Sequence, residues 1–480
     1  MIQKCLIQYI LSPMGRMMEK LSAKTRDTLF VLAGLGIVLH LFAENMSLAK
    51  YRFLIFYVVG CLLLGVMILC TVSKDMKPVK FRWPLAICWF GVGVTILISG
   101  LTQNVDYMPE AVLFLVAFPV LFICWNNCDR IRIFRLLLLI CKISLVIFIL
   151  GSFLLTDITA YVYPGIFNNT NGAAYYLAVC CICLLVELIY EKHFGAKYIA
   201  NTVLLGMAVA LMYYTNSRTG PLGAAVALAG GLAVYILTHS RKENIRCLIR
   251  LAIAAVVAVI LVLNLVYVFQ LRQKLDFPIS YNPEIGQFTV EMRESGEAEP
   301  GKKPSTNKKD EFFNISGFNT IADQKGSVGD KTMDQYSTGR ISIWMTYVQD
   351  LNWLGHAEMP KIYIDMLYKS ISTAHMTILQ VAYESGIPAG IFYFLLNIGS
   401  GLAAIWFAWR NRGEKFALMP LMITLGFGVL SMLGSCNVSF WYMTTLYYYL
   451  VQFPIIASCS AGEGRNLKAP EVADVECTHD

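Results

Sequence analysis

The chain has 480 residues, of which 57% are hydrophobic and only 15% are charged, and its mean hydropathy is +0.57. Soluble domains are usually about one-quarter charged, and one soluble core cannot bury this much apolar surface, so the composition excludes a soluble globular protein and favours a polytopic membrane protein. The net charge of +7 does not indicate nucleic-acid binding, because most basic residues lie in short loops between apolar runs, where they set membrane topology.

The N-terminal segment, residues 1–27, is expected to be cytoplasmic or interfacial. Its apolar stretches are interrupted by a proline and three basic residues: Lys4, Pro13, Arg16 and Lys20. This pattern favours a helix at the membrane surface over a cleavable signal peptide.

The rest of the chain contains about twelve apolar runs, each near the ~20 residues that a helix needs to cross a bilayer. Nine spans are expected within 28–270 and three within 386–458, which predicts an all-α polytopic membrane fold. The expected spans are 28–45, 51–72, 84–102, 110–126, 134–155, 172–190, 198–215, 219–238, 250–270, 386–409, 416–435 and 437–458.

Basic residues follow every even-numbered span. They are Lys74, Lys77, Lys80 and Arg82; Arg130, Arg132 and Arg135; Lys192 and Lys197; Arg241, Lys242, Arg246 and Arg250; and Arg410, Arg412 and Lys415. By the positive-inside rule these loops are cytoplasmic. Both termini, including the tail 459–480, are then cytoplasmic, and the long segment 271–385 is extracytoplasmic.

Motifs for metal or nucleotide chemistry are missing from the sequence. The 14 cysteines include several inside apolar runs, where thiols behave as small hydrophobic groups, and no Cys/His spacing suggests zinc. There is also no Walker loop and no Asp-rich nucleotide-sugar motif. A transferase that uses a metal and soluble nucleotide sugars is therefore disfavoured, and no cofactor is expected.

Two short outer connections carry polar residues. The first, 156–171, ends in Asn168-Asn169-Thr170-Asn171, whose side-chain oxygens can cap the sixth span. The second, 213–221, is a tight turn that contains Arg218. A guanidinium binds phosphate through paired hydrogen bonds and stays charged, so Arg218 is a candidate anion clamp. An arginine that anchors the helix at the membrane surface is an equally weighted alternative.

The large outer loop begins with a charged stretch, 291–312, which is expected to be a mobile excursion. An amphipathic helix capped by Ser337 or Thr338 follows. Its expected apolar face consists of Ile341, Trp344, Val348 and Leu351. Arg340 lies in the first turn of this helix, where it is either functional or part of a solvated face.

Two further helices are expected in the loop. One covers 361–371, and the other begins at Ser372 or Thr373 and stops at Gly386-Ile387-Pro388. His375 then lies near the start of the last helix.

Only His356 and His375, of the six histidines, lie on the outer side. A lone histidine is usually structural, but His375 is favoured by its place at a helix start beside the membrane. Glu384 is nine positions further on, and at about 100° per residue it points to the opposite side of the helix. Any group that orients His375 must therefore come from another element.

These residues together resemble the O-antigen ligase and polymerase family of bacterial envelope polysaccharide enzymes. The matching pieces are Asn168-Asn169-Thr170-Asn171-Gly172-Ala173, Asn216-Ser217-Arg218-Thr219-Gly220, Gly339-Arg340 with Trp344, and His375 with Leu379-Gln380 and Glu384-Ser385-Gly386-Ile387-Pro388-Ala389-Gly390. They stand in the family's order, on one expected side of the membrane, and the resemblance covers roughly 80–435.

The resemblance implies a metal-independent glycosyltransferase in the bacterial cytoplasmic membrane. It would move a glycan from undecaprenyl diphosphate to a lipid or cell-wall acceptor on the outer side. Arg218 and Arg340 would bind the diphosphate, and His375 would activate the acceptor hydroxyl. Residues with a substrate-contacting or supporting role would be Asn168, Asn171, Ser217, Gln380 and Glu384. Fixed arginines can compensate a diphosphate leaving group, and neutral imidazole is a suitable base near pH 7.

Three alternatives stay open. A polymerase for O-antigen, capsule or exopolysaccharide would join two lipid-linked repeat units instead of using a different acceptor. A polysaccharide flippase or transporter also suits twelve spans with inside termini, although charged residues are scarce within the spans. An envelope scaffold without catalysis is the third alternative.

Overall fold

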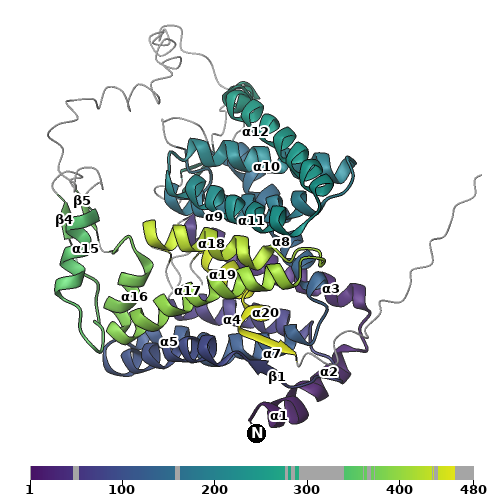
Figure 1. The fold of residues 1–480 in the computed structure, drawn as a ribbon. Helices are drawn as coiled ribbons and strands as arrows, with labels where there is room; N and C mark the ends of the chain where they lie inside the picture. The colour runs from purple at the N-terminus through teal and green to yellow at the C-terminus, as the bar shows by residue number, and fades with distance from the viewer. Residues whose placement is uncertain are drawn as a thin grey trace, which may run out of the picture.

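Most of the described chain is helical, as the apolar runs predict (Figure 1). The computed structural model describes residues 2–46, 53–156, 163–275, 279–282, 287–290, 340–360, 362–364, 369–371, 373–434, 436 and 442–459. Within these residues, nine helical segments are long and apolar enough to cross a membrane. The helical, multi-pass architecture is therefore confirmed, whereas the count of twelve spans stays a prediction.

Eight of the nine segments fall close to the expected ranges. The helix expected at 250–270 instead begins at Arg241, nine residues earlier, so the basic residues expected in the preceding loop lie within its first turns. The nine segments are α3 (Ala23–Asn45), α5 (Trp83–Thr102), the continuous run η2 (Val105–Tyr107), α6 (Met108–Val112), η3 (Leu113–Ala117) and α7 (Phe118–Asn126), then α8 (Arg130–Leu155), α9 (Thr170–Tyr190), α10 (Ala196–Tyr214), α11 (Thr219–Thr238), α12 (Arg241–Leu275) and α17 (Ile387–Arg410). Two shorter apolar helices are α4 (Phe53–Leu69) and α18 (Met419–Leu433). The N-terminal segment is helical, in α1 (Ile2–Leu6), η1 (Ile7–Leu11) and α2 (Ser12–Met18).

The last expected span, 437–458, is not one continuous helix in its described part. α19 (Met443–Leu450) is followed by α20 (Phe453–Ile456) and by strand β6 (Ala457–Cys459). Pro454 stands at the start of α20, where a helix tolerates the missing N–H. Inside a longer continuous helix the same proline would break the hydrogen-bond ladder. β6 then pairs antiparallel with β1 (Val79–Phe81). Hydropathy alone predicted one continuous helix here because most residues of the stretch are apolar or aromatic.

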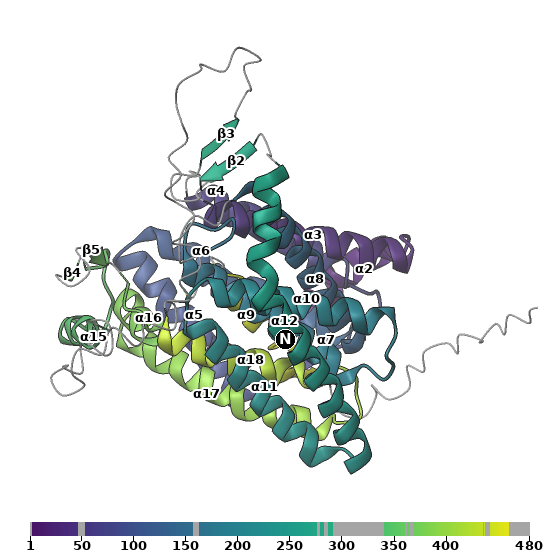
Figure 2. The same ribbon diagram turned by 90° about the horizontal axis from the view of Figure 1, so that it is seen from above.

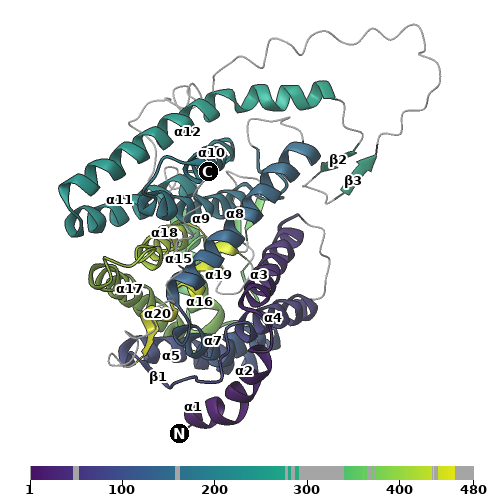
Figure 3. The same cartoon turned by 90° about the vertical axis from the view of Figure 1, so that its right-hand side faces the viewer.

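α9 is the centre of the bundle. It is buried from Gly172 to Ile189 and packs against α8, α10, α11 and α18. A helix that is apolar on all sides is stable only when neighbours surround it. α12 lies at the periphery instead (Figure 3) and exposes many apolar side chains, as a lipid-facing helix does.

Contacts between distant loops divide the bundle into two ends. At one end the basic loops meet, because Arg130 pairs with Glu414 across 2.7 Å and β1 pairs with β6. At the other end the Ser99 hydroxyl donates to the Glu384 carbonyl across 2.8 Å. The loops that were expected on one side of the membrane thus gather together. Which end faces the cytoplasm stays a prediction.

The described part of the large loop lies at the second end (Figure 2). It contains the hairpin β2 (Ile279–Asn282) and β3 (Gln287–Val290). Residues 361–371 were expected to form a helix, but β4 (Ile362–Ile364) pairs antiparallel with β5 (Lys369–Ile371). Isoleucine and tyrosine favour strands, and this local preference prevails over the weak helical period. The stretch 291–312 and the candidate caps Ser337 and Thr338 lie outside the described residues.

α15 (Arg340–Gln349) confirms the amphipathic helix but not its predicted face. Ile343 and Tyr347 are buried, and Val348 is exposed, so the apolar stripe lies about one position from the expected one. The predicted face was misplaced because Tyr347, which is buried, was not counted among the apolar residues.

α16 (Thr377–Ser385) begins later than expected, two residues after His375. It ends at Gly386, and α17 starts at once with Pro388 in its first turn, as predicted. Gly386 has φ +90, a conformation that favours glycine.

Candidate functional site

His375 lies in the link before α16, with φ +50. Residues other than glycine seldom adopt this left-handed backbone conformation. Such strained positions are enriched at functional sites. The expectation of a regular helix start at His375 was therefore wrong. The link is held in place by its neighbour Ala374, whose carbonyl accepts a hydrogen bond from the Trp344 indole across 2.9 Å.

A small apolar cluster fixes α15 against α16. Its buried members are Ile343, Tyr347, Ala374, Leu379 and Tyr383. Because this cluster is separate from the main bundle core, the two helices and the link form a unit that carries both Arg340 and His375. The site thus depends on packing within the large loop as well as on the membrane helices.

Arg340 lies close to His375. Burial lowers the pKa of His375 first, and the positive charge of Arg340 lowers it further. Arg340 also interacts electrostatically with Tyr175, in the second turn of α9. The structure therefore brings together an arginine and a histidine 35 positions apart in sequence, at the end of the central helix where the large loop lies. Tyr175 was not recognised in the sequence, where it stands among apolar neighbours.

Arg218 is the last residue before α11, and its side chain is exposed. The neighbouring Ser217 hydroxyl donates to Asn171 Oδ1 across 3.0 Å, which joins the turn to the first turn of α9. At Gly220 the start of α11 lies close to α9, since a Cβ there would be 2.9 Å from the Ala174 carbonyl oxygen. Among the described residues Arg218 forms no ion pair. The turn that carries Arg218 is therefore fixed to the first turns of α9, the helix whose Tyr175 interacts with Arg340.

The asparagines before α9 act partly as expected. Asn169 caps the helix, because its side chain accepts from the Asn171 N–H across 2.9 Å. The Asn168 N–H donates to the Asn45 carbonyl across 2.7 Å and ties this turn to α3. Asn171 therefore supports both the cap and the Ser217 turn.

Gln380 and Glu384 interact with each other on α16, one turn apart. The Gln380 amide donates to Glu384 Oε1 across 2.9 Å. Burial raises the pKa of Glu384 to about 8, and nearby Glu110 adds to the shift. The charge that acts on His375 comes from Arg340, and the direction in which Glu384 points relative to His375 stays a prediction.

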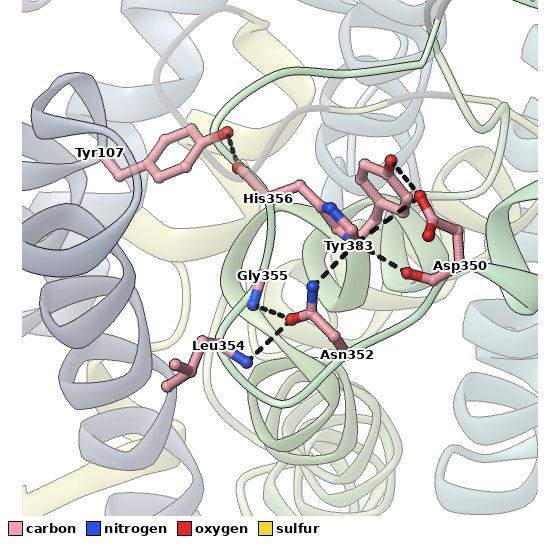
Figure 4. Close-up of polar contacts among 7 residues, drawn as sticks. All are labelled: Tyr107, Asp350, Asn352, Leu354, Gly355, His356 and Tyr383. Atoms are coloured by element: carbon pink, nitrogen blue, oxygen red, sulfur yellow. Dashed lines mark hydrogen bonds and ion pairs between the residues drawn. The ribbon is translucent and has the colours of Figure 1, made fainter.

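His356 belongs to a second polar cluster that the sequence did not reveal (Figure 4). Its ring stacks on Tyr383 at 3.9 Å between centroids, and its Nε2 lies 2.7 Å from the Asp350 carbonyl. Tyr383 donates to the Asp350 carboxylate across 2.9 Å, and Tyr107 donates to the His356 carbonyl across 3.1 Å. These contacts anchor the loop before β4 to α16 and η2. In the sequence, only the adjacent Gly355 indicated an unusual turn at His356. In the structure this glycine has φ +84.

Hydropathy and fold define the class of this protein as a multi-pass helical membrane protein with a structured loop at one end. No family model matches the chain, and no curated protein matches it either. Its function is therefore argued from the residues and their arrangement.

Proposed function

We propose that this protein is a membrane-embedded glycosyltransferase that uses a glycan on a lipid diphosphate as donor. The observation that supports the proposal is that the charge of Arg340 acts on both His375 and Tyr175, in the second turn of α9. Arg218 projects from a turn bound to the same helix and is free to accept an anion. Two guanidinium groups and one neutral imidazole are the groups that a diphosphate-leaving reaction needs.

The reaction follows from these chemical roles. An acceptor hydroxyl oxygen forms a bond to the anomeric carbon of the donor sugar, while His375 takes the hydroxyl proton. The bond between that carbon and the diphosphate oxygen breaks, and the diphosphate leaves with the electron pair. Arg218 and Arg340 stabilise the negative charge that develops on the leaving group. The lowered pKa of His375 keeps its imidazole neutral, as a base must be, at pH values near 7.

A ligase and a polymerase of this kind differ in the acceptor that they use. We favour a ligase that uses a lipid or cell-wall acceptor, with undecaprenyl diphosphate as the donor carrier and the cytoplasmic membrane as location. A polymerase would use a second lipid-linked repeat unit as acceptor.

The test is transfer by purified protein, with an undecaprenyl-diphosphate-linked glycan and either class of acceptor. We expect His375→Asn to bind the donor as wild type does and to lose transfer by a factor of about 10²–10⁴. Asparagine is the matched replacement because it tolerates positive φ, whereas alanine adds backbone strain. His193→Ala, in an exposed loop at the other end, is the control. Transfer by His375→Asn within twofold of wild type would remove the histidine from the mechanism.

A further inference from the structure

Arg250, in α12, is a buried arginine outside the candidate site. Its side chain is only 5% exposed and lies level with the far ends of α9 and α10. Its Nη2 donates to the Ile189 carbonyl in the last turn of α9 across 3.3 Å. Its own carbonyl accepts from the Tyr198 hydroxyl of α10 across 2.8 Å. Its Nε is buried and has no hydrogen-bond partner.

The charge of Arg250 is incompletely compensated. A guanidinium does not deprotonate in proteins, and a buried charge is costly unless it is paired. The end of α9 supplies only about half an elementary charge of opposite sign. Among the described residues, Arg250 forms no ion pair with a carboxylate.

The acidic residues of the neighbouring elements are already engaged. Glu187 and Glu191 pair with Lys197 across 2.9 and 3.3 Å, and Glu187 also pairs with Lys142. Glu243 accepts from the Ser240 hydroxyl and N–H at the start of α12. None of these carboxylates compensates the charge of Arg250, so an added anion could do so.

Other cations gather at this end of the bundle. Lys192, after α9, and His239, after α11, both act electrostatically on Glu243. The His239 ring stacks on Tyr235, and Tyr235 also feels the charge of Arg250. Exposed basic residues in the first turns of α12 are Arg241, Lys242 and Arg246. A diffusing anion would thus be attracted to this end of the bundle before it reaches Arg250.

The outer surface of α12 beside this basic region is apolar. Its exposed side chains are Leu248, Ile249, Ile253 and Val256. A ligand with a phosphate and long hydrocarbon chains would match both surfaces, and basic groups between transmembrane helices bind such headgroups in general. We propose that the end of α12 binds the phosphate of an anionic phospholipid, with Arg250 as its main hydrogen-bond donor.

The test uses the full chain in a neutral detergent, with lipid binding followed by native mass spectrometry and by thermal unfolding. Phosphatidylglycerol should bind and raise the unfolding temperature more than phosphatidylcholine does. Arg250→Gln should weaken phosphatidylglycerol binding by roughly tenfold or more, equivalent to about 1.4 kcal/mol. Arg246→Gln is the matched control, because it removes the same charge from an exposed position one turn earlier and should retain most of the binding.

Equal binding of the two lipids, or unchanged binding by Arg250→Gln, would overturn the proposal. If inorganic phosphate alone gives the whole stabilisation, the lipid assignment is also wrong. If Arg250→Gln does not accumulate, Arg250→Lys replaces it in the test. Lysine keeps the charge but lacks the planar fork of the guanidinium, so this variant should bind phosphatidylglycerol less tightly than wild type. The result is independent of the proposed transferase, because Arg250 lies at the opposite end of α9 from Arg340 and His375.

Discussion

The pKa of His375 is held below its usual value by burial and by the charge of Arg340. A neutral imidazole base is active above its pKa and inactive below it, so transfer should fall along an acidic limb that lies at lower pH than the ordinary imidazole value of about 6.5. Arg340→Gln removes one of the two causes and should move this acidic limb to higher pH. Rate–pH profiles at saturating donor measure the shift, and an NMR titration of the imidazole checks it without turnover. An unchanged limb would show that Arg340 does not act on His375.

The two arginines are expected to bind phosphate with their planar forks. Arg218→Lys and Arg340→Lys keep the charge but lose paired hydrogen bonds, so each should weaken donor binding by about tenfold or more. Titration calorimetry with the lipid-diphosphate donor measures this directly. Arg246→Lys, at the far end of the bundle, is the control. Wild-type affinity in both variants would leave these arginines as membrane-surface anchors.

Glu384 should make stability depend on pH. Its folded pKa of about 8 lies above the usual 4.5, so the folded state holds a proton that the unfolded state releases. Stability is then greatest below about pH 4.5, declines as the pH rises towards about 8, and levels off above that value. Glu384→Gln mimics the protonated form and should remove this decline in thermal-unfolding curves. Glu358→Gln, at an exposed position of the nearby loop, should leave it in place. Parallel curves for wild type and Glu384→Gln would contradict the buried carboxyl.

At the scale of elements, the link between α16 and α17 depends on glycine. Gly386 has φ +90, and a Cβ there would lie 2.2 Å from the Trp353 carbonyl. Gly355, on the facing loop, would place a Cβ 2.2 Å from the Glu384 carbonyl. Two backbones therefore meet at a distance that only glycine permits, which fixes the loop before β4 against α16.

Gly386→Ala should consequently destabilise the protein by at least about 1–3 kcal/mol, the usual cost of a strained backbone position. Gly401→Ala, inside α17, is the matched control, because its Cβ would meet nothing within 4 Å. It should be neutral or stabilising by up to about 1 kcal/mol, since alanine favours a helix. Equal melting temperatures for the two variants would refute the close backbone contact.

At the scale of the whole molecule, the membrane orientation follows from the basic loops. We expect 271–374 outside and both termini inside. In a background without reactive cysteines, Ser305→Cys should react with an impermeant reagent in intact cells. Lys242→Cys, in the first turn of α12, should react only after the membrane is opened. The reverse pattern would invert the topology and place the candidate site in the cytoplasm.

Several features were readable from the sequence because they depend on local or one-dimensional properties. Apolar runs near 20 residues predicted the positions of most helices, and the expected ranges of α5, α9 and α11 fall within a few residues of the observed ones. Glycine and proline at 386–388 predicted the break between α16 and α17, since both act through their own backbone. The asparagine cap of α9 is also a local contact.

Only the tertiary structure decided how the remaining pieces meet. The approach of Arg340 to His375 and Tyr175, the stacking of His356 on Tyr383, and the pairing of β1 with β6 all join residues distant in the chain. Hydropathy gives the length of an apolar segment but not its partner, so it could not show that the described residues at the last expected span, 442–459, contain two helices and a strand. The conformation of His375 was likewise hidden, because histidine seldom adopts a positive φ and nothing in the local sequence requires one there.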